Sequence, residues 1–129
     1  MTNEELLLTD PSEVLYRQVH PSWIKPNGSF SSQVFKPTPK DKGCLSVDRS
    51  SKISAHTSFE GHQSFGVSVA ILGVTVGRVT DVGLASFDDV LADKPAHSYI
   101  DMTGKSRGQI EGLAGKLRDV AVDRGVLHP

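Results

Sequence analysis

One segment near the C-terminal end of the sequence has the spacing of a buried helix face. Between positions 106 and 124 the apolar residues recur every three or four positions, at Ile110, Leu113, Ala114, Leu117 and Ala121. This spacing places them on a single stripe of an α-helix. Ser106 is a natural N-cap, and Gly125 is typical of the residue that follows a helix end. We therefore expect a helix over about 106–124, whose stripe has to pack against another layer of structure.

The rest of the chain is divided into short runs that are rich in β-branched and aromatic residues and separated by proline or glycine. Such runs indicate β-strands. We expect strands at 14–20, 30–36, 44–47, 65–72, 74–82 and 97–102. Gly73 falls between two of these runs, which are either adjacent strands or one bent strand. The acidic stretch 84–93 is expected to form a loop or helical turn, and Ser54 is expected to cap a short helix that runs to Glu60.

Together these elements predict an α+β fold. A mostly antiparallel sheet of five or six strands would carry the C-terminal amphipathic helix on one face. At 129 residues, the chain has the size of one domain with a modest core. We expect a flexible N-terminal arm at 1–13 and a single α+β domain at 14–129.

The composition excludes several classes of protein. The single cysteine, Cys44, cannot form an internal disulfide, which fits a reducing compartment. No apolar run approaches the roughly 20 residues of a transmembrane helix, and the acidic start is unlike a secretory signal. His56 and His62 have no further ligands at metal spacing. We expect a cytoplasmic protein without membrane contact, metal or cofactor.

Positive charge is concentrated in residues 14–52, which carry seven Lys or Arg and only two Asp. The same segment holds a high density of side chains that donate or accept hydrogen bonds. This coincidence favours an anionic ligand, which we expect to be a nucleotide or a nucleic acid. In the alternative interpretation, Lys36, Lys40 and Lys42 simply solvate a loop.

Three residues are candidates for catalysis: Arg17, His20 and His97. Histidine transfers protons near neutral pH, and the planar arginine fork matches two phosphate oxygens. Both histidines flank expected strands, so we expect their rings at one open end of the sheet. The candidate ligand contacts are Lys40 for phosphate, with Ser32, Gln33 and Thr38 for orientation. These residues would allow phosphodiester or nucleotide chemistry. Alternatively each histidine only hydrogen-bonds a turn, and the sequence leaves open whether a reaction takes place.

A longer pattern runs through the same segment. It reads Arg-Gln-Val-His-Pro at 17–21, Ser-Ser-Gln-x-Phe-x-Pro-Thr-x-Lys-Asp at 31–41, and Leu-Ser-Val at 45–47. With His97 and the terminal helix, this pattern resembles a group of small bacterial proteins over about 14–127. The resemblance implies a bacterial origin and no particular activity. It also implies that Asp41, Ser46 and Arg118 belong to the site, beside the residues already named.

The rival hypothesis is a non-catalytic interaction module, such as one component of a toxin–antitoxin or defence operon. In that case the loop at 37–43 and the helix at 106–124 would contact a protein partner. The polar side chains of the early segment would then brace the chain internally. Their surroundings discriminate between the hypotheses, because a ligand site requires them to line an open pocket.

Overall fold

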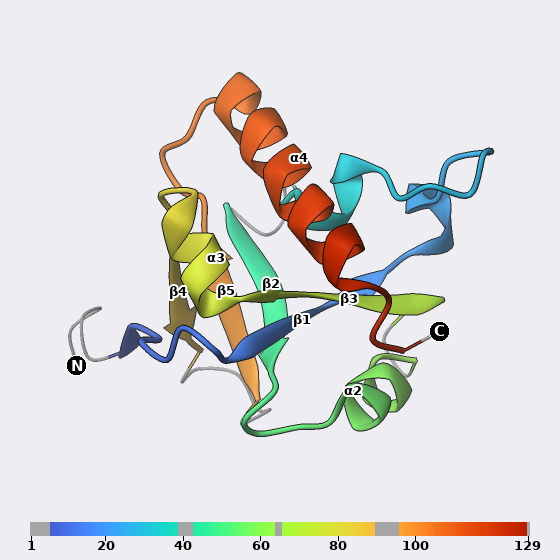
Figure 1. The fold of residues 1–129 in the computed structure, drawn as a ribbon, viewed down its shortest axis with the longest axis horizontal. Coiled ribbons are helices and arrows are strands. Elements are labelled where there is room, and N and C mark those ends of the chain that lie inside the picture. The colour runs from blue at the N-terminus through green and yellow to red at the C-terminus, as the bar shows by residue number, and fades with distance from the viewer. Residues whose placement is uncertain (1–5, 39–42, 64–65, 90–95, 129) are drawn as a thin grey trace.

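The computed structural model describes residues 6–38, 43–63, 66–89 and 96–128. The chain forms five strands, three α-helices and two short 3₁₀ helices within this part (Figure 1). In chain order they are β1 (Val14–Val19), η1 (Pro21–Trp23), η2 (Ser32–Phe35), β2 (Cys44–Arg49), α2 (Ala55–His62), β3 (Ala70–Thr75), α3 (Val76–Asp81), β4 (Ala85–Asp88), β5 (His97–Asp101) and α4 (Arg107–Arg124). None of the described helices is both long enough and apolar enough to cross a membrane.

The strands form one antiparallel sheet in the order β3-β1-β2-β5-β4. The α+β class, the five-stranded antiparallel sheet and the packed C-terminal helix confirm the fold expected from the sequence. β1 pairs with β3 along its whole length, from Val14–Thr75 to Val19–Ala70. Its pairing with β2 is limited to Leu15–Arg49 and Tyr16–Asp48. β1 and β2 therefore separate after two residue pairs, and this separation creates the space for the site described below.

The core lies between one face of the sheet and a layer made of α4, η2 and α3 (Figure 1). Side chains alternate along each strand, so residues two apart share a face. Leu15 and Val19 of β1 face the core, as do Leu45 and Val47 of β2. The opposite face is polar and is partly covered by α2, which contacts β1 and β3.

Helix α4 supplies the apolar stripe that its spacing predicts. Ala114, Leu117 and Ala121 are fully buried, whereas Ile110 and Leu113 pack at the margin of the core. Ser106 and Gln109 form a reciprocal capping box at the start of the helix. Gly125 ends the helix with a φ of 98°, a conformation that strains residues with a Cβ. The helix therefore begins and ends where the sequence indicates.

Two expected strands are helical instead. Residues 32–35 form η2, in which the consecutive side chains of Val34 and Phe35 are both buried. A strand would turn one of these side chains away from the core. Residues 76–81 form α3, because the Thr75 hydroxyl caps the backbone N–H of Arg78. The buried pair of α3, Val76 and Val79, has helical spacing inside a run of β-branched residues.

The boundaries of β3 and β4 also differ from those expected. β3 begins at Ala70 rather than 65, and it continues through Gly73 without a break. A Cβ at position 73 would lie 2.5 Å from Leu127 Cδ1, so the glycine permits close approach of the C-terminal segment. The acidic stretch expected as a loop contains strand β4, in which Phe87 stacks on Tyr99 of β5.

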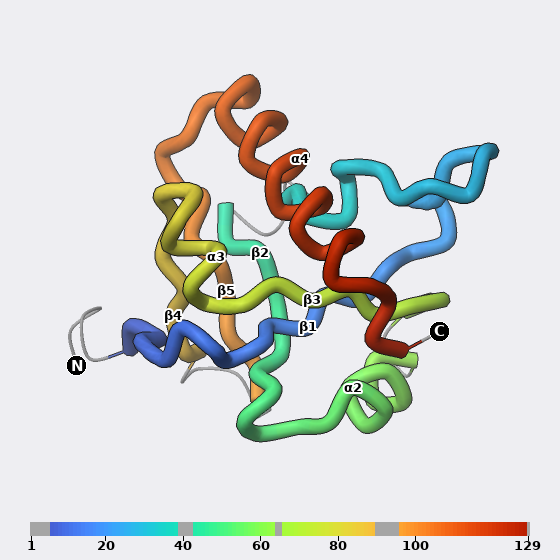
Figure 2. The backbone as a smooth tube through the Cα atoms, in the orientation of Figure 1, coloured from blue at the N-terminus to red at the C-terminus, as the bar shows by residue number. Residues whose placement is uncertain are grey.

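Both edges of the sheet are covered by segments from the two ends of the described chain (Figure 2). Leu7 bridges Phe87 of β4, and the Leu8 N–H donates to the Ser86 carbonyl at 2.8 Å. At the other edge, the Ile71 N–H of β3 donates to the His128 carbonyl at 2.8 Å. These contacts satisfy backbone groups that an edge strand otherwise leaves exposed.

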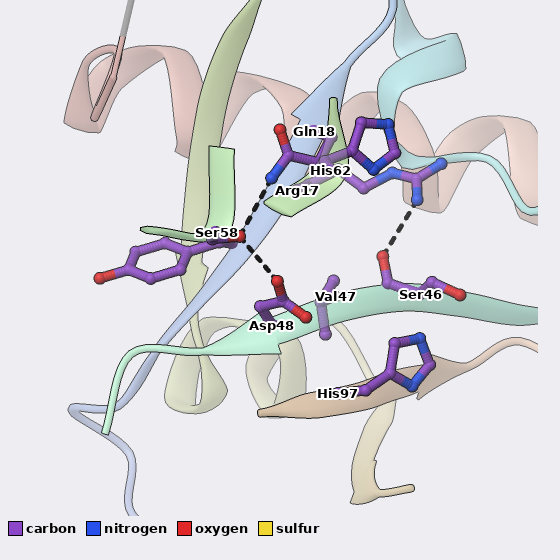
Figure 3. A pocket seen from close by; sticks show the side chains of 9 residues that line it. Arg17, Gln18, Ser46, Val47, Asp48, Ser58, His62 and His97 are labelled. Atoms are coloured by element: carbon purple, nitrogen blue, oxygen red, sulfur yellow. Dashed lines mark hydrogen bonds between the residues drawn. The ribbon is translucent and has the colours of Figure 1, made fainter. Parts of the chain in front are cut away.

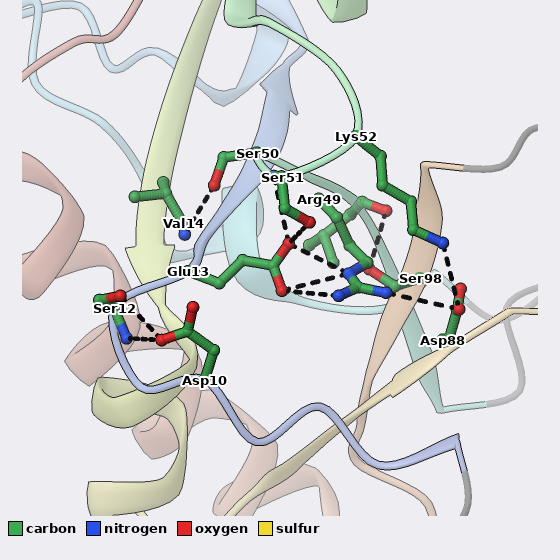
Figure 4. A network of polar contacts seen from close by, with 11 residues as sticks. Asp10, Ser12, Glu13, Val14, Arg49, Ser50, Ser51, Lys52, Asp88 and Ser98 are labelled. Atoms are coloured by element: carbon green, nitrogen blue, oxygen red, sulfur yellow. Dashed lines mark hydrogen bonds and ion pairs between the residues drawn. The ribbon is translucent and has the colours of Figure 1, made fainter.

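A buried ionic network fixes the start of β1 to the end of β2 (Figure 4). Glu13 is only 6% exposed, and its Oε1 lies 2.9 Å from Arg49 Nη2. Ser51 donates to the same carboxylate through both its N–H and its hydroxyl. Burial alone raises the pKa of Glu13, but the bonds from Arg49 and Ser51 outweigh burial and lower the pKa below its usual value.

Replacing Glu13 with glutamine should destabilise the protein in a pH-dependent way. The substitution leaves the largely buried Arg49 without its main counter-charge, which costs about 3 kcal/mol at pH 7. A lowered folded-state pKa stabilises above the unfolded-state pKa, and this stabilisation is lost as pH falls through the folded-state pKa. Urea unfolding should therefore show a gap between parent and E13Q that narrows from about pH 5 downward. The exposed Glu60→Gln control should lose less than about 0.5 kcal/mol, and an E13Q loss that stays constant down to pH 3 would contradict this account.

Candidate functional site

Arg17 occupies the position where β1 and β2 separate. Its Nε donates to the Val34 carbonyl at 2.7 Å, and its Nη1 donates to the Ser46 carbonyl at 3.0 Å. Its guanidinium carbon also lies 5.3 Å from the centre of the Trp23 ring. The Arg17 side chain therefore joins β2, η2 and η1, and it supplies Ser46 with a donor that the ladder with β1 does not provide.

A cavity of about 300 Å³ opens beside this guanidinium, and we call it the sheet pocket (Figure 3). The pocket is lined by β1, β2, α2 and the start of β5, through Tyr16, Arg17, Gln18, Ser46, Val47, Asp48, Ser58, His62 and His97. The register of β1, β2 and β5 explains why several of these side chains lie close together. Asp48 is paired with Tyr16 on one side and with His97 on the other, so all three side chains share the polar face of the sheet.

Helix α2 completes one wall of the sheet pocket through a chain of hydrogen bonds. Gln18 Nε2 donates to Ser58 Oγ at 3.0 Å, and Ser58 Oγ donates to Asp48 Oδ2 at 2.6 Å. Ser58 is buried, so these bonds fix the carboxylate relative to the sheet. The second carboxylate oxygen, Oδ1, makes no hydrogen bond within the described residues.

His97 enters the sheet pocket from the start of β5. Its Nδ1 is buried and lies 2.9 Å from Asp89 Oδ2, within ion-pair distance but without the orientation of a hydrogen bond. The Asp89 carboxylate favours a proton on the nitrogen that faces it. Nε2, the other ring nitrogen, makes no hydrogen bond within the described residues.

A second cavity, of about 660 Å³, lies between η2 and the first turn of α4. We call it the basic cleft, because Lys36 and Arg107 are among its lining residues, which are Trp23, Gln33, Lys36, Pro37, Thr38, Gly43, Arg107 and Ile110. Lys36 pairs with Glu111 of α4, and Ser32 donates to the same carboxylate. The pKa of Glu111 is lowered mainly by Lys36 and then by Ser32, so Glu111 stays ionised and offsets the Lys36 charge. Arg107 is exposed and is not in an ion pair within the described residues.

The residues expected to form one site are divided between these two cavities. Arg17, Ser46 and His97 meet in the sheet pocket, whereas Gln33 and Thr38 line the basic cleft. Ser32 lies beside the cleft through its bond to Glu111. Lys40 and Asp41 lie outside the described residues.

Two further candidates lie elsewhere. His20 caps η1, where its Nδ1 accepts from the Ser22 N–H at 3.1 Å, and it is not among the residues lining the sheet pocket. Histidine capping of a turn is the alternative that the sequence leaves open. Arg118 donates to its neighbour Asp119 at 3.0 Å on α4.

Several lining residues carry no local signal in the sequence. Asp48, Ser58 and Gln18 are brought together by strand register and by the position of α2, which are long-range features. The role of Trp23 had a weak signal, since it is the single tryptophan in a polar, basic segment. Arg107 follows directly after the predicted N-cap of the terminal helix.

No group of three His, Cys, Asp or Glu side chains able to hold a metal ion occurs among the described residues. Neither a protein-family model, nor a curated protein, nor a solved structure matches this chain. The resemblance to small bacterial proteins therefore stays a prediction. Functional inference depends on the geometry of the two cavities.

Replacing Arg17 with lysine should destabilise the protein although the charge is kept. A single ammonium cannot reproduce the fork that reaches the Val34 and Ser46 carbonyls, so one buried acceptor loses its donor, at a cost of about 1–3 kcal/mol. Urea unfolding followed by Trp23 emission should show this loss together with a changed native emission spectrum. Arg118→Lys is the matched control and should change stability by less than about 0.5 kcal/mol. Equal effects of the two substitutions would show that Arg17 does not bridge β2 and η2.

Proposed function

We propose that this protein binds an anionic ligand of the nucleotide or nucleic-acid class, and that it does so in the basic cleft. The observation that carries the proposal is the convergence of Lys36, Arg107 and Trp23 on a single cavity. We place this activity in a bacterial cytoplasmic protein, as the sequence resemblance and composition suggest.

Charge supports an anionic ligand. Lys36 and Arg107 contribute two positive charges to the cleft, and Glu111 offsets one of them. The remaining charge resides on an exposed arginine at the start of α4. An arginine fork binds phosphate oxygens through two parallel hydrogen bonds, which a lysine cannot reproduce.

The Trp23 ring supports a ligand that contains a base. Nucleobases stack on aromatic side chains, and each stacked base contributes about 1–3 kcal/mol to binding. Arg17 lies 5.3 Å from the centre of the Trp23 ring and holds it in place at the wall of the cleft. Gln33 and Thr38 add an amide and a hydroxyl for polar contacts with the ligand.

One observation favours the rival function, a protein-interaction module such as a toxin–antitoxin or defence component. Three polar residues of the early segment are engaged within the chain: Arg17 with two carbonyls, His20 with Ser22 and Ser32 with Glu111. Under this alternative, their bonds brace the surface of η1 and η2 for a protein partner.

Trp23 fluorescence gives a direct test, because the chain has a single tryptophan. Titration with AMP and with a short single-stranded RNA should quench or shift the emission in a saturable way. Arg107→Gln should weaken binding about tenfold, the loss expected for one charge-assisted contact. Binding of the RNA should also weaken as salt concentration rises.

The matched control is Arg124→Gln, which removes the same charge from the other end of α4. It should leave the affinity within about twofold of the parent value. If both arginine variants lose affinity equally, attraction by net charge explains the binding and the cleft does not. If neither AMP nor RNA changes the Trp23 signal, the proposal is wrong.

A further inference from the structure

We propose that the sheet pocket is a separate ligand site, which takes a small planar organic cation of the amidinium or guanidinium class between Asp48 and His97. This site is distinct from the basic cleft, and the argument for it does not depend on nucleotide binding. It depends on the acceptors, charges and walls of the pocket.

The two proposed contact residues lie side by side on neighbouring strands. Asp48 of β2 is the direct partner of His97 of β5. The adjacent pair is hydrogen-bonded, since the Arg49 N–H donates to the Ala96 carbonyl at 2.9 Å. Hydrogen-bonded and non-hydrogen-bonded pairs alternate along an antiparallel ladder, so Asp48 and His97 form a non-hydrogen-bonded pair, in which side chains approach most closely.

Both residues present an unused acceptor. Ser58 Oγ donates to Asp48 Oδ2, whereas Asp48 Oδ1 makes no hydrogen bond within the described residues. His97 Nδ1 faces Asp89, and in a neutral imidazole with its proton on Nδ1, Nε2 is an acceptor. A ligand with two N–H donors in one plane can therefore donate to Asp48 Oδ1 with one and to His97 Nε2 with the other.

The charge of the pocket favours a cation. Asp48 and Asp89 contribute two negative charges around His97. Arg17 contributes one positive charge, but its Nε and Nη1 are directed to the Val34 and Ser46 carbonyls. Asp48 Oδ1 is therefore a charged atom of the lining that can still accept a hydrogen bond, and a carboxylate accepts most strongly from a cationic donor.

The walls of the pocket suit a planar ligand. Tyr16 contributes an aromatic ring and Val47 contributes an apolar surface, and the cavity of about 300 Å³ has the size of a small-molecule site. A cation close to a tyrosine face gains a further attraction from the ring.

Benzamidine and benzamide provide a matched pair of probes. They share size and planarity, but only benzamidine carries a positive charge and N–H donors on both nitrogens. Calorimetric titration of the full chain should show saturable benzamidine binding, and benzamide should bind at least about tenfold more weakly. Amide resonances of β2 and β5 should shift in the NMR spectrum of the benzamidine complex.

Two variants localise the binding. Asp48→Asn keeps the shape of the side chain and an acceptor for Ser58, and it should weaken benzamidine binding at least about tenfold. Asp123→Asn removes the same charge from the exposed face of α4 and should leave the affinity unchanged. Thermal unfolding of each variant checks that the fold is intact. If a variant does not fold, the shifts of the β2 and β5 resonances in the parent protein show whether benzamidine binds in the sheet pocket.

Three outcomes would overturn the proposal. Benzamide could bind as tightly as benzamidine, which would mean that the charge of the ligand does not contribute to binding. Asp123→Asn could weaken binding as much as Asp48→Asn, which would indicate attraction by net charge alone. Benzamidine could fail to saturate the parent protein at millimolar concentration, which would show that the pocket is not a site for this class of cation.

Discussion

The opening between β1 and β2 depends on one guanidinium group, that of Arg17. β1 pairs with β2 over only two residue pairs, and past this point the Ser46 carbonyl has no partner in the ladder. A buried carbonyl without a donor costs about 1–3 kcal/mol. Arg17 removes this cost by donating to Ser46 and, through a second nitrogen, to Val34 of η2. The strands can therefore separate without a penalty in unpaired backbone groups, and the opening between them becomes a cavity.

The same group lies between the two cavities, lining one and contacting a wall residue of the other. On one side it lines the sheet pocket, together with Asp48 and His97. On the other it holds Trp23, which lines the basic cleft. The positive charge expected from residues 14–52 is thus largely used within the chain, because Arg17 bonds to carbonyls and Arg49 to Glu13. The segment is basic in composition, yet among its described residues Arg49 and Lys36 are each paired with a carboxylate.

The sequence was sufficient where a local pattern determines the structure. The stripe of α4, its capping serine and its terminal glycine are local features, and they gave the helix within a residue at its start. The strands β1, β2 and β5 were likewise indicated by short β-branched runs. The runs at 30–36 and 74–82 were misleading, since their β-branched and aromatic residues favour strands, whereas their buried positions are consecutive or three apart. In these two runs, the hydroxyls of Ser31 and Thr75 cap the first turn and favour a helix.

The candidate site was only partly predictable for the same reason. Arg17, Ser46 and His97 were named from residue type and from resemblance, and the structure does bring them together. Asp48 and Ser58 were missed because their role depends on the register between distant strands and on where α2 lies. His20 was grouped with His97 because both flank strands, but the ends of β1 and β5 that they flank do not meet in one cavity.

The covered edges of the sheet limit how this protein can recognise anything else. The Leu8 N–H donates to a backbone carbonyl of β4, and the His128 carbonyl accepts from a backbone amide of β3. An extended peptide could bind as an additional strand only after it had displaced these segments. Recognition by main-chain pairing, which is tolerant of sequence, is therefore blocked at these positions. Selectivity is then left to the side chains on the two faces of the sheet.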